Sequence, residues 1–97
     1  MIKVFYMLKD RLLSLFHGER TTAWFERETG IDRYRWQNIK SGRARISDAE
    51  IEAVIKIFPQ YAYWITTGQI LPQAGQVSPE YEELALAEQP RKSGTND

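Results

Sequence analysis

The sequence predicts an all-α domain of five helices, followed by a short C-terminal helix and a disordered tail. Along most of the chain, apolar residues recur at steps of three and four, which is the period of a helix with one buried face. A glycine or proline follows each helical segment, as is typical of helix ends. No segment of any length shows the apolar–polar alternation of a strand.

The chain has 97 residues, which is room for one domain. We expect this domain at residues 1–68, a linker and short helix at 69–89, and the tail at 90–97. The sequence has no cysteine, which excludes disulfides and thiolate metal sites and favours a reducing environment. The apolar start of the chain is too short for a signal peptide or a membrane span, so a cytoplasmic protein is expected.

The first two helices are predicted at residues 3–17 and from Thr21 to the residue before Gly30. The first has an apolar stripe and is expected to end at Gly18, a suitable residue for a left-handed cap. The second is predicted to begin with Thr21 as its N-cap and to end at Gly30, which permits a sharp turn. The stripe of the first helix consists of Phe5, Leu8, Leu12, Leu15 and Phe16.

A third helix is predicted at about residues 32–41, with Asp32 as N-cap and Gly42 just past its end. Trp36 and Ile39 lie three apart and should point inward. Two lines of polar residues then fall on the opposite face: Arg33, Gln37 and Lys40 form one, and Tyr34, Asn38 and Ser41 form the other.

The remaining helices have clear start and stop signals. Ser47 and Glu50 form a capping box that opens a helix to about Phe58. A short aromatic helix should follow, from Pro59 or Gln60 to Thr67. The last helix is predicted to start at Ser78-Pro79-Glu80, where serine caps and proline occupies the first helical position.

The basic residues cluster around the third helix. The net charge of the whole chain is zero, but residues 20–45 carry +4, whereas residues 46–97 carry −5. A local basic patch of this kind attracts a polyanion without a basic overall composition. The alternative interpretation is a chance cluster on a solvated surface.

The polar face of the third helix carries the side chains that fit DNA. Arginine can bind guanine with two hydrogen bonds, and glutamine or asparagine can bind adenine in the same way. We expect base contacts from Arg33, Tyr34 and Gln37, with Asn38 beside them. We expect phosphate contacts from Thr22, Lys40, Arg43 and Arg45. The alternative is that these residues form only the solvated face of an amphipathic helix.

The sequence offers little to support catalysis. It contains no glycine-rich phosphate loop, no metal-binding spacing of histidine or cysteine, and no nucleophile motif. We therefore expect no enzymatic activity, no cofactor and no bound small molecule.

The span from about Leu12 to Ile65 resembles the Cro/phage-repressor (XRE-like) helix-turn-helix family. The resemblance rests on the Thr21-Thr22 cap, Phe25, Gly30-Ile31 at the turn, the inward Trp36 and Ile39, and Gly42 with the basic residue after it. It implies a five-helix, lambda-repressor-like domain that binds operator DNA, usually as a homodimer. It also implies a small bacterial or prophage regulator with base contacts at Arg33, Tyr34 and Gln37.

Two residues depart from the family pattern. Glu26 stands where a small residue is usual, close to the following helix, and should either turn outward or pair with Arg33 or Arg35. Trp36 replaces the usual aliphatic residue and should splay the two helices slightly.

Together these observations predict a sequence-specific transcriptional regulator, a repressor that binds double-stranded DNA as a homodimer. A single 97-residue chain contacts only a few base pairs, so pairing on two half-sites is expected. The dimer surface is expected around Tyr61, Tyr63, Tyr81 and Leu84. The alternative function is a protein–protein interaction module, or an antitoxin-like partner, whose contact surface is the acidic second half.

Overall fold

The computed structural model describes residues 7–88, and the chain is all-α in this range, as predicted. The start of the predicted first helix and the predicted tail at 90–97 lie outside the described residues. Apart from one isolated antiparallel bridge between Leu71 and Gln76, residues 7–88 contain no β-structure. The helices are α1 (Leu8–Leu13), α2 (Thr22–Thr29), α3 (Arg33–Lys40), α4 (Asp48–Ile57), η1 (Pro59–Tyr61), α5 (Ala62–Thr67), η2 (Pro72–Ala74) and α6 (Pro79–Glu88).

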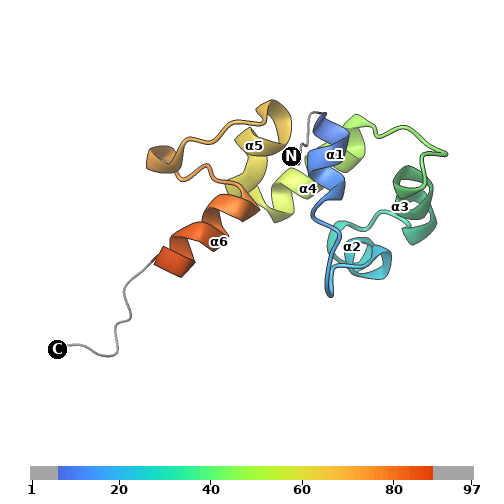
Figure 1. Cartoon of the computed structure of the whole chain (residues 1–97). Helices are drawn as coiled ribbons and strands as arrows, with labels where there is room; N and C mark the ends of the chain where they lie inside the picture. Colours follow the sequence, from blue (N-terminus) through green and yellow to red (C-terminus); the bar gives the residue numbers. More distant parts are fainter. Residues whose placement is uncertain (1–6, 89–97) are drawn as a thin grey trace.

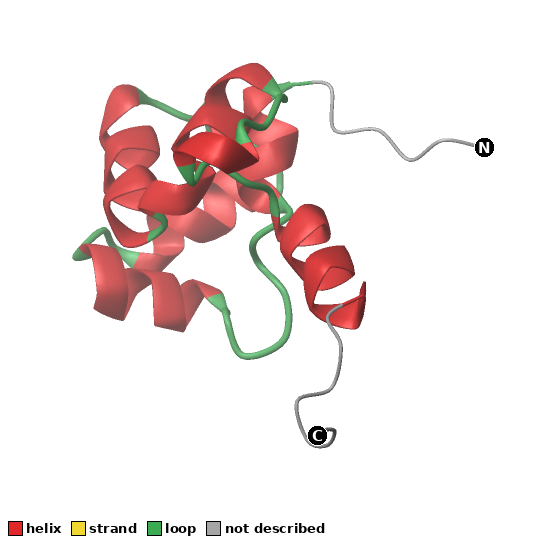
Figure 2. Cartoon of the chain, turned by 90° about the vertical axis from the view of Figure 1, so that its left-hand side faces the viewer, coloured by secondary structure: helices red, strands yellow, loops and turns green. Residues whose placement is uncertain are grey.

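Helices α1 to α5 pack around one core, and α6 extends away from it (Figures 1 and 2). Helix α2 lies against both α3 and α4, while α1 lies against α5. Helix α3 therefore sits at the edge of the bundle, on the side away from α6 (Figure 1). None of the helices within residues 7–88 is both long and apolar enough to span a membrane.

The centre of the core is aromatic. The rings of Phe16 and Phe25 stack with centroids 3.8 Å apart, and the ring centroids of Trp36 and Phe25 lie 5.3 Å apart. Trp36 is fully buried, and its indole N–H lies 3.4 Å from the hydroxyl oxygen of Thr29. Since rings of this size dominate the burial of apolar surface, this cluster fixes α3 against α2. The buried apolar residues are Leu12, Leu15, Phe25, Trp36, Ile39, Val54, Phe58, Tyr61 and Ile65.

The first helix ends four residues earlier than the sequence predicted. Helix α1 stops at Leu13, where the Ser14 hydroxyl donates a 2.6 Å hydrogen bond to the carbonyl of Arg11. The chain then turns, so Phe16 reaches the core from the loop rather than from a helix. Gly18, predicted as the helix cap, instead lies with φ +61° in the turn before α2.

The predicted ends of α2 and α3 are confirmed. The Thr21 side chain accepts a 3.2 Å hydrogen bond from the backbone N–H of Trp24, and Gly30 ends α2 in a left-handed conformation with φ +78°. The Asp32 carboxylate accepts from the backbone N–H of Tyr34 at 3.0 Å and caps α3. Gly42 follows α3 with φ +86° and donates to the carbonyl of Ile39.

The aromatic fifth helix is split into two types of helix. It begins at Pro59 as the 3-10 helix η1 and becomes the α-helix α5 at Ala62, ending at Gly68 as predicted. Proline has no N–H to donate, so it is tolerated at the start of this segment, immediately after α4 ends.

Hydrogen bonds attach the linker and α6 to the bundle. The side chain of Gln76 donates to the carbonyl of Pro59 at 3.0 Å and accepts from the N–H of Tyr63 at 2.9 Å. The hydroxyl of Tyr61 donates a 2.7 Å hydrogen bond to the carboxylate of Glu82 on α6. Burial and this bond to Glu82 raise the pKa of Tyr61 to about 12. The side chain of Ser78 caps α6, as predicted, by accepting from the N–H of Tyr81.

Candidate nucleic-acid interface

Helix α3 presents one buried face and one exposed face, as the sequence predicted. Trp36 and Ile39 are fully buried, whereas Arg33, Tyr34 and Gln37 are exposed. Tyr34 has 65% of its surface accessible, the largest share of any Phe, Trp or Tyr within residues 7–88. Since α2 is the main packing partner of α3, the outer face remains open to a ligand.

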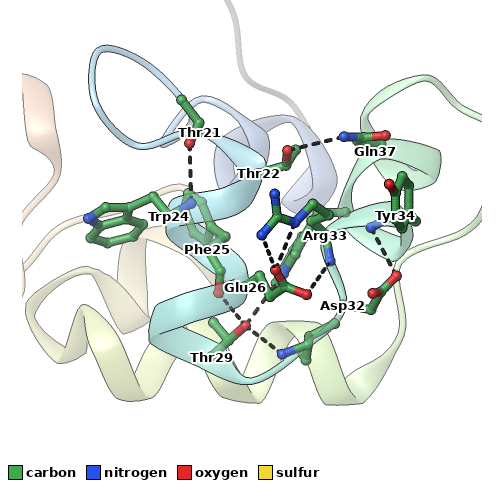
Figure 3. A network of polar contacts seen from close by, with 12 residues as sticks. Thr21, Thr22, Trp24, Phe25, Glu26, Thr29, Asp32, Arg33, Tyr34 and Gln37 are labelled. Carbon is green, nitrogen blue, oxygen red and sulfur yellow. Dashed lines mark hydrogen bonds and ion pairs between the residues drawn. The ribbon is translucent and has the colours of Figure 1, made fainter.

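Glu26 on α2 pairs with Arg33 at the start of α3 (Figure 3). Its Oε1 accepts from Nε of Arg33 at 2.8 Å and lies 2.7 Å from Nη2, while its Oε2 accepts from the Arg33 backbone N–H at 3.3 Å. The hydrogen bond from the Arg33 side chain lowers the pKa of Glu26 from its ordinary value. Of the partners expected for Glu26, the structure therefore selects Arg33.

Arg35 has a different partner, on α4. Its Nε donates to Glu50 at 2.8 Å, and its Nη2 donates to the carbonyl of Arg45 at 2.7 Å. These bonds hold the loop after α3 against the start of α4. The side chain of Arg45 is exposed on that loop, where the sequence predicted a phosphate contact.

The N-terminus of α2 lies beside the exposed face of α3. Nε2 of Gln37 lies 3.4 Å from the hydroxyl oxygen of Thr22, as Figure 3 shows. Both residues line a shallow hollow that also includes Lys40. A predicted base contact and two predicted phosphate contacts therefore meet at one place. The hollow is lined by Phe16, His17, Gly18, Arg20, Thr21, Thr22, Gln37, Lys40 and Ser41.

Asn38 is engaged with the loop that follows α3. Its side-chain oxygen accepts from Nε of Arg43 at 3.2 Å, and its carbonyl accepts from the N–H groups of Arg43 and Ala44. Asn38 is partly buried, unlike the three exposed residues predicted beside it. It positions Arg43, whose own side chain is exposed at the end of α3.

The four residues predicted for dimerisation have different surroundings. Tyr61 is only 4% exposed and belongs to the core, so it offers almost no area to a partner. Tyr63 is partly buried in α5, whereas Tyr81 and Leu84 on α6 are 38% and 56% exposed. Leu86, which the sequence analysis did not single out, is 69% exposed on the same helix.

Two residues near α3 were not assigned from the sequence. His17 and Arg20 line the hollow beside Thr22, and Arg20 also lies with its guanidinium 5.1 Å from the centre of the Phe58 ring. The sequence signal that could have identified Arg20 is its position directly before Thr21, the N-cap of α2. A residue there lies close to the start of that helix. Within residues 7–88, no cluster of histidine, aspartate or glutamate could hold a metal ion.

Comparison with known proteins relates the chain to a phage protein. No protein-family profile matches the sequence, and no curated protein matches it. Among solved structures, it is similar to Pf6r from the filamentous phage Pf6 of Pseudomonas aeruginosa, with a TM-score of 0.70 and 31% sequence identity. The similarity covers 77% of this chain and 97% of Pf6r. On this evidence, the chain belongs to the same protein family as Pf6r.

Proposed function

We propose that this protein is a transcriptional regulator that binds double-stranded DNA by inserting α3 into the major groove. The observation that carries the proposal is the pairing of α2 with α3 through a left-handed glycine turn, with the outer face of α3 left exposed. A helix on such a turn fits the major groove, whose width admits one α-helix.

The chemistry of the exposed face supports DNA as the ligand. Arg33, Tyr34 and Gln37 offer hydrogen-bond donors toward base edges, and the N-terminal end of α3 is the part expected to enter deepest. Lys40, Arg43 and Arg45 surround the other end and supply positive charge toward phosphates. Thr22 places a hydroxyl next to Gln37 at the start of α2, where a phosphate oxygen would be bound.

We propose that the protein acts as a homodimeric repressor of the Cro/phage-repressor type. Two copies would place two α3 helices on successive major grooves, and the occupied operator would exclude polymerase. Two exposed side chains that lie three residues apart on α6, and therefore on one face of it, supply the proposed contact between copies: Tyr81 and Leu84. Similarity to a protein of a filamentous phage fits a role in phage or prophage gene control.

The test is selection of bound duplexes from a random pool, followed by titration of the best site and of an unrelated duplex at several salt concentrations. We expect a palindromic site, and affinity that falls steeply as salt rises because bound phosphates release counterions. Absence of binding to any duplex at low salt would contradict the proposal. That result would favour the protein–protein module instead, with the acidic second half as its contact surface.

A further inference from the structure

We propose that Glu26 is a positioning residue for DNA recognition: it holds Arg33 so that its guanidinium faces a guanine rather than a phosphate. This inference rests on the DNA-binding function proposed above. It goes further by assigning a role to a residue outside the recognition helix and by naming the base that the start of α3 should prefer.

The geometry of the Glu26–Arg33 pair leaves the edge of the guanidinium formed by Nη1 and Nη2 available to a ligand. The arginine donors that face Oε1 of Glu26 belong to Nε and Nη2, at 2.8 and 2.7 Å. A guanidinium carries five N–H groups in a rigid plane, so the edge formed by Nη1 and Nη2 still offers two parallel donors. Those two donors match O6 and N7 of guanine.

The second carboxylate oxygen fixes the same residue through its backbone. Oε2 of Glu26 accepts from the N–H of Arg33 at 3.3 Å, at the first residue of α3. One carboxylate thus binds both the main chain and the side chain of Arg33. The Arg33 side chain is 47% exposed while it is bound in this way, so the paired arginine is still accessible to a ligand.

The pair should limit non-specific binding. An unpaired arginine on a flexible side chain can turn to the nearest phosphate, which carries no sequence information. Glu26 competes with that phosphate for the Nε and Nη2 donors, and its own negative charge repels the DNA backbone. Loss of the carboxylate should therefore strengthen binding to unrelated DNA while weakening the preference for guanine.

Glu26→Ala is the decisive variant, and Glu28→Ala is its matched control. Both residues lie on α2 and both changes remove one negative charge, but Glu28 is paired with Arg27 of its own helix. Affinities would be measured by fluorescence anisotropy for the selected site, for duplexes with each guanine of a half-site replaced, and for an unrelated duplex. Thermal unfolding would verify that each variant folds, and Glu26→Met, a good helix former of similar length without an oxygen acceptor, would serve if Glu26→Ala does not fold.

For Glu26→Ala we expect the preference for guanine at one position of each half-site to fall roughly tenfold. Binding to the unrelated duplex should tighten, with a salt slope steeper by about one phosphate contact. Glu28→Ala should retain the guanine preference and the salt slope of the unchanged protein. In the free protein, the NMR signal of the Arg33 Nε proton should be protected from exchange and should lose that protection in Glu26→Ala.

A double-mutant comparison separates positioning from a general effect on α3. In an Arg33→Ala background, Glu26→Ala should no longer lower the preference for guanine, because the residue it positions is gone. An equal loss in both backgrounds, or an intact guanine preference in Glu26→Ala alone, would overturn the proposal while leaving DNA binding established. Failure of the unchanged protein to bind any duplex would overturn both proposals.

Discussion

Arg35 of α3 and Glu50 of α4 form a two-pronged ion pair, with Nε to Oε2 at 2.8 Å and Nη2 to Oε1 at 3.2 Å. The same carboxylate accepts from the backbone N–H and the hydroxyl of Ser47 at 2.7 and 2.6 Å. Burial raises the pKa of Glu50, but the hydrogen bonds from Arg35 and Ser47 outweigh it and bring the pKa to about 2. One buried carboxylate therefore connects α3, the loop after it and the cap of α4.

Stability should depend on the charge of Glu50 at acid pH. Because its pKa in the folded protein lies below the value of 4.5 for a free carboxyl, its contribution is complete above that value and is lost as the pH falls toward 2. The shift corresponds to about 3 kcal/mol in the free energy of unfolding. Urea unfolding at a series of pH values would measure it.

Two variants isolate this effect. Glu50→Gln should lower the free energy of unfolding at neutral pH. It should also make this free energy depend less steeply on pH at the acid end of the profile, the acid limb. Glu52→Gln, at an exposed position on the same helix, should leave that limb unchanged. A profile of equal steepness in Glu50→Gln would show that another group causes the acid sensitivity.

Base and phosphate contacts should respond differently to truncation. Gln37→Ala is expected to cost about 1–3 kcal/mol on the selected site and to relax specificity at one base pair. Lys40→Ala should weaken selected and unrelated duplexes alike and reduce the salt slope by about 1. Anisotropy titrations at several salt concentrations distinguish the two patterns, and their reversal would show that the roles of these residues were assigned wrongly.

Two glycines with the same backbone conformation should differ in their tolerance of a side chain. Gly30 and Gly68 have φ values of +78° and +82°, so alanine at either is expected to cost about 1–2 kcal/mol in backbone strain. A Cβ at Gly30 would meet no atom within 4 Å other than those of its chain neighbours, whereas at Gly68 it would lie 3.2 Å from Nη1 of Arg11. Arg11 is buried and donates to the carbonyl of Ile65, so its side chain cannot easily move away from an added methyl group.

Gly68→Ala should therefore lower the unfolding midpoint in urea more than Gly30→Ala does. Equal losses would mean that backbone strain alone decides both positions. Gly30→Ala remains informative beyond stability, because the glycine sets the turn between α2 and α3. Its effect on DNA affinity would report how closely recognition depends on that angle.

Self-association should depend on the exposed apolar side chains of α6. Leu84 is 56% exposed, so Leu84→Glu should leave the stability of the monomer, measured at low protein concentration, nearly unchanged while it dissociates the proposed dimer. Sedimentation at tens of micromolar protein would give the mass of both forms. Glu83→Ala, an exposed neighbour on the same helix, is the control. A monomer mass for the unchanged protein would contradict the dimer.

The sequence predicted most of the fold because caps and periodicity are local signals. Thr21, Gly30 and Asp32 mark the ends of α2 and α3 where the structure places them, and the spacing of Trp36 and Ile39 predicted their burial. Local signals also explain the error in α1. Leu15 and Phe16 continue the helical spacing although the chain has already turned, because an apolar loop residue can reach the same core.

The ion-pair partners could not be predicted from the sequence, because they depend on the distance between helices in the packed structure. Glu26 had two candidate arginines, and only the packed structure assigns Arg33 to Glu26 and Arg35 to Glu50. The same holds for Tyr61, which was expected on the dimer surface as part of the aromatic fifth helix. In the fold, its ring stacks on the ring of Phe58 and its hydroxyl donates a hydrogen bond to Glu82, so Tyr61 joins α6 to the core.

The bonds of the Gln76 side chain to Pro59 and Tyr63, together with the bond from Tyr61 to Glu82, hold α6 in one direction relative to the bundle. In a dimer formed through α6, that direction also fixes how far apart the two copies hold their α3 helices. The operator would then tolerate little change in its central spacer. Adding about 5 base pairs, half a turn of the duplex, would carry one half-site to the opposite side of the DNA, out of reach of the second α3.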